Sequence, residues 1–244
     1  MDDAALAAHL AETAGRILLA VRDSGVFSAR ALGKAGDHTA NAFLVHALQE
    51  ARPDDGLLSE EVKCDGARLA KARVWIIDPL DGTREYGEGR SDWAVHVALV
   101  VDGSAREGAV ALPGLGITLC SGSPAPLPPA NAPLRMLVSR TRPAAEAVAV
   151  AEKMGAELVG MGSAGAKAMA VVRGEADIYL HTGGQHEWDN AAPAAVAQAA
   201  GLHVSRADGS PLRYNNADPY LPDLLICRPE LAEQVMALFQ ALPR

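Results

Sequence analysis

Aromatic residues are scarce in this chain, so other side chains must fill its core. Its 244 residues include only 3 Phe, 3 Trp and 4 Tyr, although 49% are hydrophobic. Alanine, leucine and valine therefore have to supply most of the packing. Cysteine is equally rare, and Cys64, Cys120 and Cys227 are isolated from one another. That pattern excludes a thiol metal site of standard spacing and is typical of a reducing cytoplasm.

Positive charge is also in deficit. Lys and Arg number 22 against 30 Asp and Glu, which gives a formal net charge of −8. Surfaces that bind nucleic acid are usually basic, so we expect no nucleic-acid partner. The apolar runs are far shorter than a membrane span, and the acidic start of the chain differs from a secretory signal. We therefore expect a cytoplasmic protein that has no contact with a membrane.

Segments with helical and strand-like patterns alternate along the chain, which indicates layered α/β or α+β packing. The expected helices are 2–23, 38–51 with Asp37 as N-cap, 143–154, 166–173, 190–200 and 229–241. The expected strands are 74–77, 93–101, 108–112, 116–120, 134–139, 156–160, 176–181 and 223–227. A hairpin around Pro113 makes a purely parallel sheet improbable. The Pro-rich loop 121–133 is the expected boundary between an N-terminal α+β subdomain (1–125) and a C-terminal α/β subdomain (134–244).

One acidic segment, DPLDGT at residues 78–83, follows an apolar run. Pro79 has no N–H group and stops ladder pairing. The carboxylates of Asp78 and Asp81 and the carbonyl of Leu80 can therefore aim at one point. Carboxylate and carbonyl oxygens are the ligands that Mg²⁺ prefers, so the segment predicts a cation site.

Further groups support this prediction. The N–H groups of Gly82 and Thr83 can form a nest for a phosphate. Glu60 follows a short apolar run, and Asp189 opens a helix, where it can cap with one oxygen and bind metal with the other. Ordinary turns and a helix N-cap are the plain alternatives. Two metals that share such carboxylates would stabilise the attacking water and the leaving oxygen of a phosphoryl transfer.

Three blocks resemble the signature of the inositol monophosphatase-like, lithium-sensitive phosphatases. They read LSEE at 58–61, WIIDPLDGT at 75–83 and WDNAA at 188–192. Their order and spacing agree with that family over roughly residues 10–230. The resemblance implies a layered αβαβα sandwich of two subdomains. It also implies Mg²⁺-dependent hydrolysis of small phosphate monoesters by in-line attack of water.

The same resemblance assigns roles to residues. One Mg²⁺ would be held by Glu60, Asp78 and the Leu80 carbonyl, and a second by Asp78, Asp81 and Asp189. Thr83 would pair with Asp37 and position the attacking water, with Glu60 beside them, and a third Mg²⁺ could bind near Asp37. The residues before Asp37 read Lys-Ala-Gly, without the Val-Thr of the family, which leaves an N-cap as the alternative role.

The block after Thr83, Arg84-Glu85-Tyr86, is more similar to the 3′(2′),5′-bisphosphate nucleotidase (CysQ-type) branch than to inositol phosphatases. Thr182 stands where inositol phosphatases place a Glu, seven residues before Asp189. The resemblance thus implies removal of the 3′-phosphate of adenosine 3′,5′-bisphosphate in sulfate assimilation, by a homodimer. Lys167 would neutralise the second phosphate. The expected substrate contacts are Gly82, Thr83, Arg84, Ser163, Lys167 and Tyr214.

Other functions stay open on the sequence. Inositol monophosphatase or fructose-1,6-bisphosphatase activity, on a sugar phosphate, is the nearest alternative. The segment GMGSAG at 160–165 fits the G-x-G-x-x-G of NAD-binding dehydrogenases, although Asp177 precedes the next strand instead of ending it. The acids could also form a structural Ca²⁺ site, but the chain has no EF-hand loop.

Overall fold

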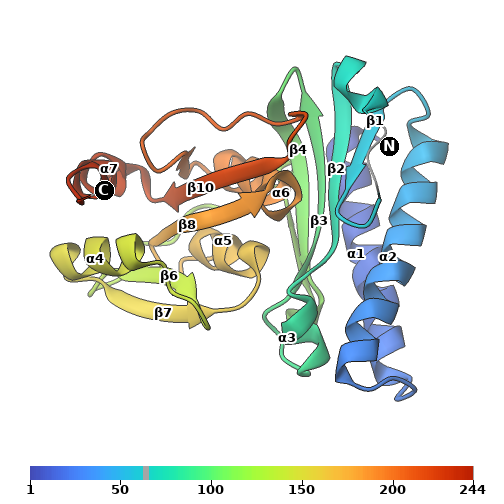
Figure 1. Ribbon diagram of the computed structural model, residues 1–244, viewed down its shortest axis with the longest axis horizontal. Helices are drawn as coiled ribbons and strands as arrows, with labels where there is room; N and C mark the ends of the chain where they lie inside the picture. Colours follow the sequence, from blue (N-terminus) through green and yellow to red (C-terminus); the bar gives the residue numbers. More distant parts are fainter. Residues whose placement is uncertain (63–65, 244) are drawn as a thin grey trace.

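The protein has five layers, two β-sheets and three layers of helices (Figure 1). The computed structural model describes residues 1–62 and 66–243, so Cys64 lies outside the described residues. The first sheet has the order β1 (Gly56–Ser59), β2 (Arg73–Asp81), β3 (Ala94–Val101), β4 (Ser104–Leu112), β5 (Ile117–Cys120). The second has the order β7 (Glu157–Met161), β6 (Arg135–Ser139), β8 (Ile178–His186), β10 (Tyr220–Cys227), β9 (His203–Ser205).

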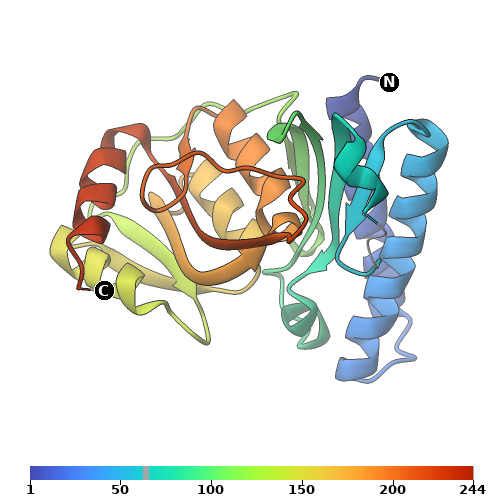
Figure 2. The ribbon, with the colours of Figure 1, turned by 45° about the horizontal axis from the view of Figure 1, so that its top comes forward.

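The helices fill the spaces on both sides of the sheets (Figures 1 and 2). Helices α1 (Asp3–Asp23) and α2 (Ala29–Ala51) cover the outer face of the first sheet. Helices α5 (Ala164–Val172) and α6 (Glu187–Ala199) lie between the sheets, and α4 (Ala145–Met154) and α7 (Ala232–Gln240) cover the second sheet. A short helix α3 (Thr83–Gly87) and the 3₁₀ turns Ala67–Ala70, Pro113–Leu115 and Pro229–Leu231 connect these elements. The layered αβαβα sandwich expected from the sequence is confirmed.

Strand β2 shows why the sequence forms these layers. Successive side chains of a strand point to opposite faces of the sheet. Val74 and Ile76 accordingly pack in the core between the two sheets. Trp75 and Ile77 pack against α1 and α2 on the other face. The same alternation carries Asp78 to the inner face, toward α6.

The start of α2 differs from the sequence prediction. The helix begins at Ala29, with Ser28 at the N-cap position, so Asp37 lies inside the helix and is not its N-cap. Gly33 and Gly36 lie inside this helix, and both serve close packing. A Cβ atom on Gly33 would stand 2.6 Å from the Thr83 methyl group, and one on Gly36 would stand 2.9 Å from the Tyr86 ring. Glycine lets α2 approach α3 at both places.

Helix α1 is long and apolar enough to cross a membrane by length and composition, and it is the one such helix in the described chain. Its apolar side packs against α2 and the first sheet, with Ala7, Ala14 and Leu18 fully buried. A core helix meets the same criteria. The absence of a membrane contact and the cytoplasmic location stay predictions, as do the two subdomains and the homodimer.

Candidate active site

The acidic residues meet where two parallel strands end. Strand β1 pairs with β2 in parallel, with Ser59 opposite Ile77. The next residues along each strand are Glu60 and Asp78. Because parallel strands have their carboxyl ends at the same edge of a sheet, these two carboxylates are brought together.

A third acid arrives from the start of α6. Strand β2 turns Asp78 and Asp81 toward this helix, and Asp189 lies in its first turn. Carboxylate oxygens of these three residues all lie within 4.8 Å of one another. Asp189 caps α6 from inside the first turn, where it accepts a 2.6 Å hydrogen bond from the His186 N–H. One oxygen therefore caps the helix, and the other is left for a ligand.

Asp81 is bound to the second half of the chain at the N-terminus of α5. Its Oδ2 atom accepts hydrogen bonds from the Ser163 hydroxyl at 2.6 Å and the Gly165 N–H at 2.7 Å. Negative charge is favourable at a helix N-terminus. The glycine-rich segment 160–165 thus binds a carboxylate of this same chain where a dehydrogenase would bind a pyrophosphate.

His96 connects the two acidic blocks and was missed in the sequence analysis. It lies opposite Asp78 in the β2–β3 register and is fully buried. Its Nδ1 atom is 2.9 Å from the Trp188 carbonyl, and its Nε2 atom is 3.2 Å from Asp81 Oδ2. The Trp188 carbonyl and an ionised Asp81 can only accept, so the doubly protonated imidazolium is the form of the ring that suits both contacts. Burial alone would lower the pKa of His96, but the contact with Asp81 outweighs it and raises the pKa.

The pKa values of the four carboxylates differ strongly from one another. Burial, then the charges of Glu60 and Asp81, raise the pKa of Asp78 well above its usual range. Desolvation and the charges of Asp189 and Asp81 raise the pKa of Glu60 to about 7. Burial and Asp81 raise that of Asp189 to about 6. Burial would also raise the pKa of Asp81, but the contacts with His96 and Ser163 lower it to about 2.

The raised pKa values indicate that the cluster has too little positive charge nearby to offset its carboxylates. Carboxylates packed so closely repel one another, and desolvation strengthens that repulsion. Hard oxygen ligands within reach of one point are the donor set that Mg²⁺ or a similar cation requires. The residues therefore fit divalent cations. Without a cation to offset their repulsion, they would be unfavourable as a purely structural cluster.

The predicted pair of Thr83 and Asp37 is not formed. The Thr83 hydroxyl donates instead to the Leu80 carbonyl, at 3.1 Å. Asp37 faces Glu61 and Glu60; burial, followed by their charges, raises its pKa to about 8. One of its carboxylate oxygens is buried and has no partner among the described residues. Asp37 thus lies at the rim of the acidic cluster, and its catalytic role stays a prediction.

Two predicted substrate contacts, Ser163 and Lys167, make hydrogen bonds within the protein. The Ser163 hydroxyl is bound to Asp81, as above. The ammonium group of Lys167 donates to the carbonyl of Ser163 at 2.7 Å and also to that of Gly162. Its side chain is 5% exposed and lies 5.2 Å from the Tyr179 ring centroid. In this conformation Lys167 holds the loop before α5.

Tyr214 is buried away from the acidic cluster, and its role as a substrate contact stays a prediction. Its ring is buried in the core between the sheets. Its N–H donates to the carbonyl of Gly103, in the turn that follows β3. That turn lies at the opposite end of β3 from Ala94, which pairs with Asp81. Seven strand residues separate those ends by roughly 24 Å.

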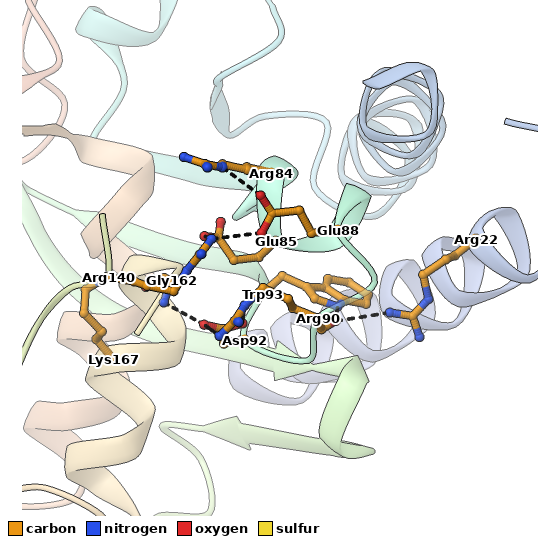
Figure 3. Close-up of polar contacts among 10 residues, drawn as sticks. All are labelled: Arg22, Arg84, Glu85, Glu88, Arg90, Asp92, Trp93, Arg140, Gly162 and Lys167. Atoms are coloured by element: carbon orange, nitrogen blue, oxygen red, sulfur yellow. Dashed lines mark hydrogen bonds and ion pairs between the residues drawn. The ribbon is translucent and has the colours of Figure 1, made fainter. Parts of the chain in front are cut away.

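The loop before α5 is fastened to α3 and to the segment after it (Figure 3). The Gly162 N–H donates to Asp92 at 2.7 Å, and Arg140 donates to Glu85 at 2.8 Å. Gly162 packs so closely on Glu85 that a Cβ atom would stand 2.4 Å from its Cγ. Glu85 therefore supports the loop that binds Asp81. Arg84 is exposed and pairs with Glu88.

Replacing His96 by leucine is expected to destabilise the metal-free protein by about 3 kcal/mol, because it leaves buried Asp81 without its cationic partner. The melting temperature in EDTA should fall by roughly 6–12 °C. The same change in an Asp81→Asn background should have a much smaller effect. Equal losses in both backgrounds would show that His96 acts by packing and not through Asp81.

The fold and the cluster together define a class: layered α+β proteins that hold divalent cations between two sheets. The sequence profile of the inositol monophosphatase family matches residues 4–244. The chain belongs to the inositol monophosphatase family, whose members are metal-dependent. The resemblance found in the three sequence blocks is thereby confirmed.

Individual relatives agree with this assignment. A Mycobacterium leprae protein named 3′-phosphoadenosine 5′-phosphate phosphatase is 50% identical to this chain, covering 98% of it and 94% of the relative. The 3′(2′),5′-bisphosphate nucleotidase CysQ of Escherichia coli is 29% identical, covering 77% of this chain and 81% of CysQ. The solved structure of CysQ from Bacteroides thetaiotaomicron has a TM-score of 0.79 at 26% identity, covering 92% and 96% of the two chains.

Proposed function

We propose that this chain is a Mg²⁺-dependent phosphatase that removes the 3′-phosphate of adenosine 3′,5′-bisphosphate. The observation that carries the proposal is the convergence of Asp78, Asp81 and Asp189 within 4.8 Å in a chain of this family. The 50% identity with a 3′-phosphoadenosine 5′-phosphate phosphatase supports the substrate, since the two names describe one compound.

The cations would be held as the sequence blocks suggest. Glu60, Asp78 and the Leu80 carbonyl form one donor set, and Asp78, Asp81 and Asp189 form the other. Bound cations supply Lewis acidity toward the phosphate and its leaving oxygen. Two sets that share Asp78 are consistent with the structure, because the charges of Glu60, Asp81 and Asp189 all act on this buried carboxylate.

The protein's own groups would orient the reactants. The N–H groups of Gly82 and Thr83 open α3, where the first helical N–H groups have no partner within the helix. They would bind phosphate oxygens. One buried oxygen of Asp37 has no hydrogen-bond partner within residues 1–62 and 66–243, and Asp37 would orient the attacking water and take its proton. Asp81, held by three donors, would keep its place through the reaction.

The nucleotide is favoured over inositol phosphates by the residue at position 182. Inositol phosphatases place a Glu at the position of Thr182, where its carboxylate contacts the hydroxyl groups of the sugar. Here Thr182 donates its hydroxyl to Glu146 at 2.7 Å on the surface. A sugar would thus lose a carboxylate contact. Fructose-1,6-bisphosphate stays an alternative because it also carries two phosphates.

The test is a phosphate-release assay with purified protein and Mg²⁺. Adenosine 3′,5′-bisphosphate, inositol 1-phosphate and fructose 1,6-bisphosphate are compared at equal concentrations. We expect the nucleotide to have the highest kcat/KM by at least tenfold. A preference for either sugar phosphate would overturn the proposed substrate while leaving the enzyme class intact.

A further inference from the structure

The first residue of α6 carries a buried carboxylate that neither proposed donor set uses. Glu187 is fully buried and lies two residues before Asp189. It is not among the three carboxylates that lie within 4.8 Å of one another. A buried charge is costly unless its oxygens are paired, so the partners of Glu187 indicate its role.

The carboxylate of Glu187 binds the segment that precedes β10. Its Oε2 atom accepts a 2.7 Å hydrogen bond from the Asn215 N–H. Its Oε1 atom accepts 2.8 Å hydrogen bonds from the backbone N–H and the side-chain amide of Asn216. The Glu187 N–H donates in turn to the Pro219 carbonyl at 2.8 Å. The segment 213–219, here called the strap, therefore holds the first residue of α6 by both its backbone and its side chain.

The strap is also bonded to the first half of the chain, and Figure 2 shows it reaching from the second sheet toward the first. Arg68, in the 3₁₀ turn after β1, donates to the Asn215 side-chain carbonyl at 2.6 Å and to the Asn216 backbone carbonyl at 2.8 Å. The Asn215 amide donates back to the Arg68 carbonyl at 3.1 Å. The strap thus connects the start of α6 to the turn Ala67–Ala70, which follows Glu60 along the chain.

Asp189 needs such an anchor. Its carboxylate lies within 4.8 Å of oxygens of Asp78 and Asp81, and charged carboxylates at this distance repel one another until a cation binds. The repulsion acts to move the start of α6 away from β2. Hydrogen bonds that hold this helix start in place keep the donors together before the cation arrives. Donors that are already in place bind more tightly, because binding does not have to order them.

We propose that Glu187 is a positioning residue, which anchors the start of α6 to the strap and thereby sets the affinity of the acidic cluster for Mg²⁺. This inference rests on the proposed cation site, and Glu187 acts through Asp189 without being a donor itself. Capping of α6 is already performed by Asp189, which accepts from the His186 N–H. The hydrogen bonds of the Glu187 carboxylate go to the strap instead, so its role is to fix the helix relative to the first sheet.

The chain contains a matched carboxylate far from the acids. Asp177 is also fully buried, and it accepts hydrogen bonds from the backbone N–H groups of Asn131 and Arg135 and from the Asn131 side-chain amide. It precedes β8, so the length of this strand, roughly 26 Å, separates it from His186 and α6. Replacing either carboxylate by its amide removes the same kinds of hydrogen bond. Both changes should therefore lower the melting temperature in EDTA by similar amounts.

The test compares Glu187→Gln with Asp177→Asn by calorimetric titration of the metal-free protein with Mg²⁺. The Kd for Mg²⁺ should rise about tenfold in Glu187→Gln, as is typical when a group that supports metal ligands is lost. It should change by less than about twofold in Asp177→Asn, because distant sites without shared partners act independently. A fixed concentration of Mg²⁺ should accordingly raise the melting temperature of Glu187→Gln less than that of Asp177→Asn.

A milder pair of variants keeps the inference testable if the buried carboxamides prevent folding. Asn216→Ala removes one amide hydrogen bond to Glu187, and Asn131→Ala removes the equivalent bond to Asp177. Asn216→Ala should raise the Kd for Mg²⁺ about threefold, as expected for one hydrogen bond to a charged group. Asn131→Ala should leave it unchanged.

The outcomes separate this inference from the proposed function. The same Kd in the wild type and Glu187→Gln, or equal rises in Glu187→Gln and Asp177→Asn, would overturn the positioning role and leave the proposed function intact. A wild-type protein that binds no Mg²⁺ would overturn the cation site, and the role of Glu187 with it. A rise confined to the Glu187 and Asn216 variants supports the inference.

Discussion

Replacing Asp78 by asparagine is expected to lower kcat by about a thousandfold, which corresponds to roughly 4 kcal/mol of lost transition-state stabilisation. Asp78 belongs to both proposed donor sets, so its loss weakens both cations at once. The amide oxygen of asparagine can still accept the 3.0 Å hydrogen bond from the Leu80 N–H, and the local turn should persist. Phosphate release under saturating Mg²⁺ measures the effect.

The same variant should be more stable than the wild type in EDTA. Asp78 is 1% exposed, and burial, followed by the charges of neighbouring carboxylates, raises its pKa by disfavouring the charged form. A neutral amide removes that repulsion, so the melting temperature should rise while activity falls. Asp54→Asn, a change of an exposed aspartate, should alter neither quantity. Near-full activity of the Asp78 variant would contradict the metal assignment.

Removing metal from the wild-type protein is expected to abolish hydrolysis, with a loss of at least a thousandfold, and Mg²⁺ should restore it. Removal should also lower stability. A cation at one hundred times its dissociation constant adds about 2.7 kcal/mol to the folded state. For a chain of this size that is roughly 5–10 °C in melting temperature.

The stability of the metal-free protein should fall as the pH rises. In the folded protein the pKa is raised for Asp189 to about 6, for Glu60 to about 7 and for Asp37 to about 8. The folded, metal-free protein thus binds more protons than the unfolded chain above about pH 4. The stabilisation that these extra protons contribute is fully present below that pH. It is lost as the pH rises through 6 to 8. Asp81, with a pKa of about 2, has the opposite effect only in strong acid.

Thermal unfolding in EDTA between pH 5 and 8.5 measures this slope, and excess Mg²⁺ should flatten it. Asp37→Asn should remove part of the slope near pH 8. A metal-free protein whose melting temperature rises from pH 5 to pH 8 would contradict the repulsion described here.

The parts of the site that are local in sequence could be predicted from it. Asp78 and Asp81 end an apolar strand and precede a glycine, and Asp189 lies in the first turn of a helix, so these local patterns and the family resemblance together indicated the acids. His96 could not be predicted, because its role depends on which residue of β3 faces Asp78. The role of Lys167 depends likewise on how its own loop folds back.

The errors in the fold have physical reasons of the same kind. The glycines of the segment 33–36 indicate a loop by their conformational freedom, yet here they let two helices approach. Only the position of Thr83 and Tyr86 in space reveals that use. Helix α3 has five residues, too few to show a helical period. Ser163 was assigned to substrate from the family resemblance, and the sequence could not show that its hydroxyl binds Asp81, which lies 82 residues earlier.

The distribution of the acids along the chain has a consequence for synthesis. Glu60, Asp78 and Asp81 leave the ribosome more than one hundred residues before Asp189, and the donors Ser163 and Gly165 also come late. Strands β1 to β5 can pair while only three of the four carboxylates exist and Asp81 lacks its helix N-terminus. A nascent chain halted before α6 would therefore carry a first sheet with an incomplete cation site. The proposed cation site would therefore be complete only in the last third of translation.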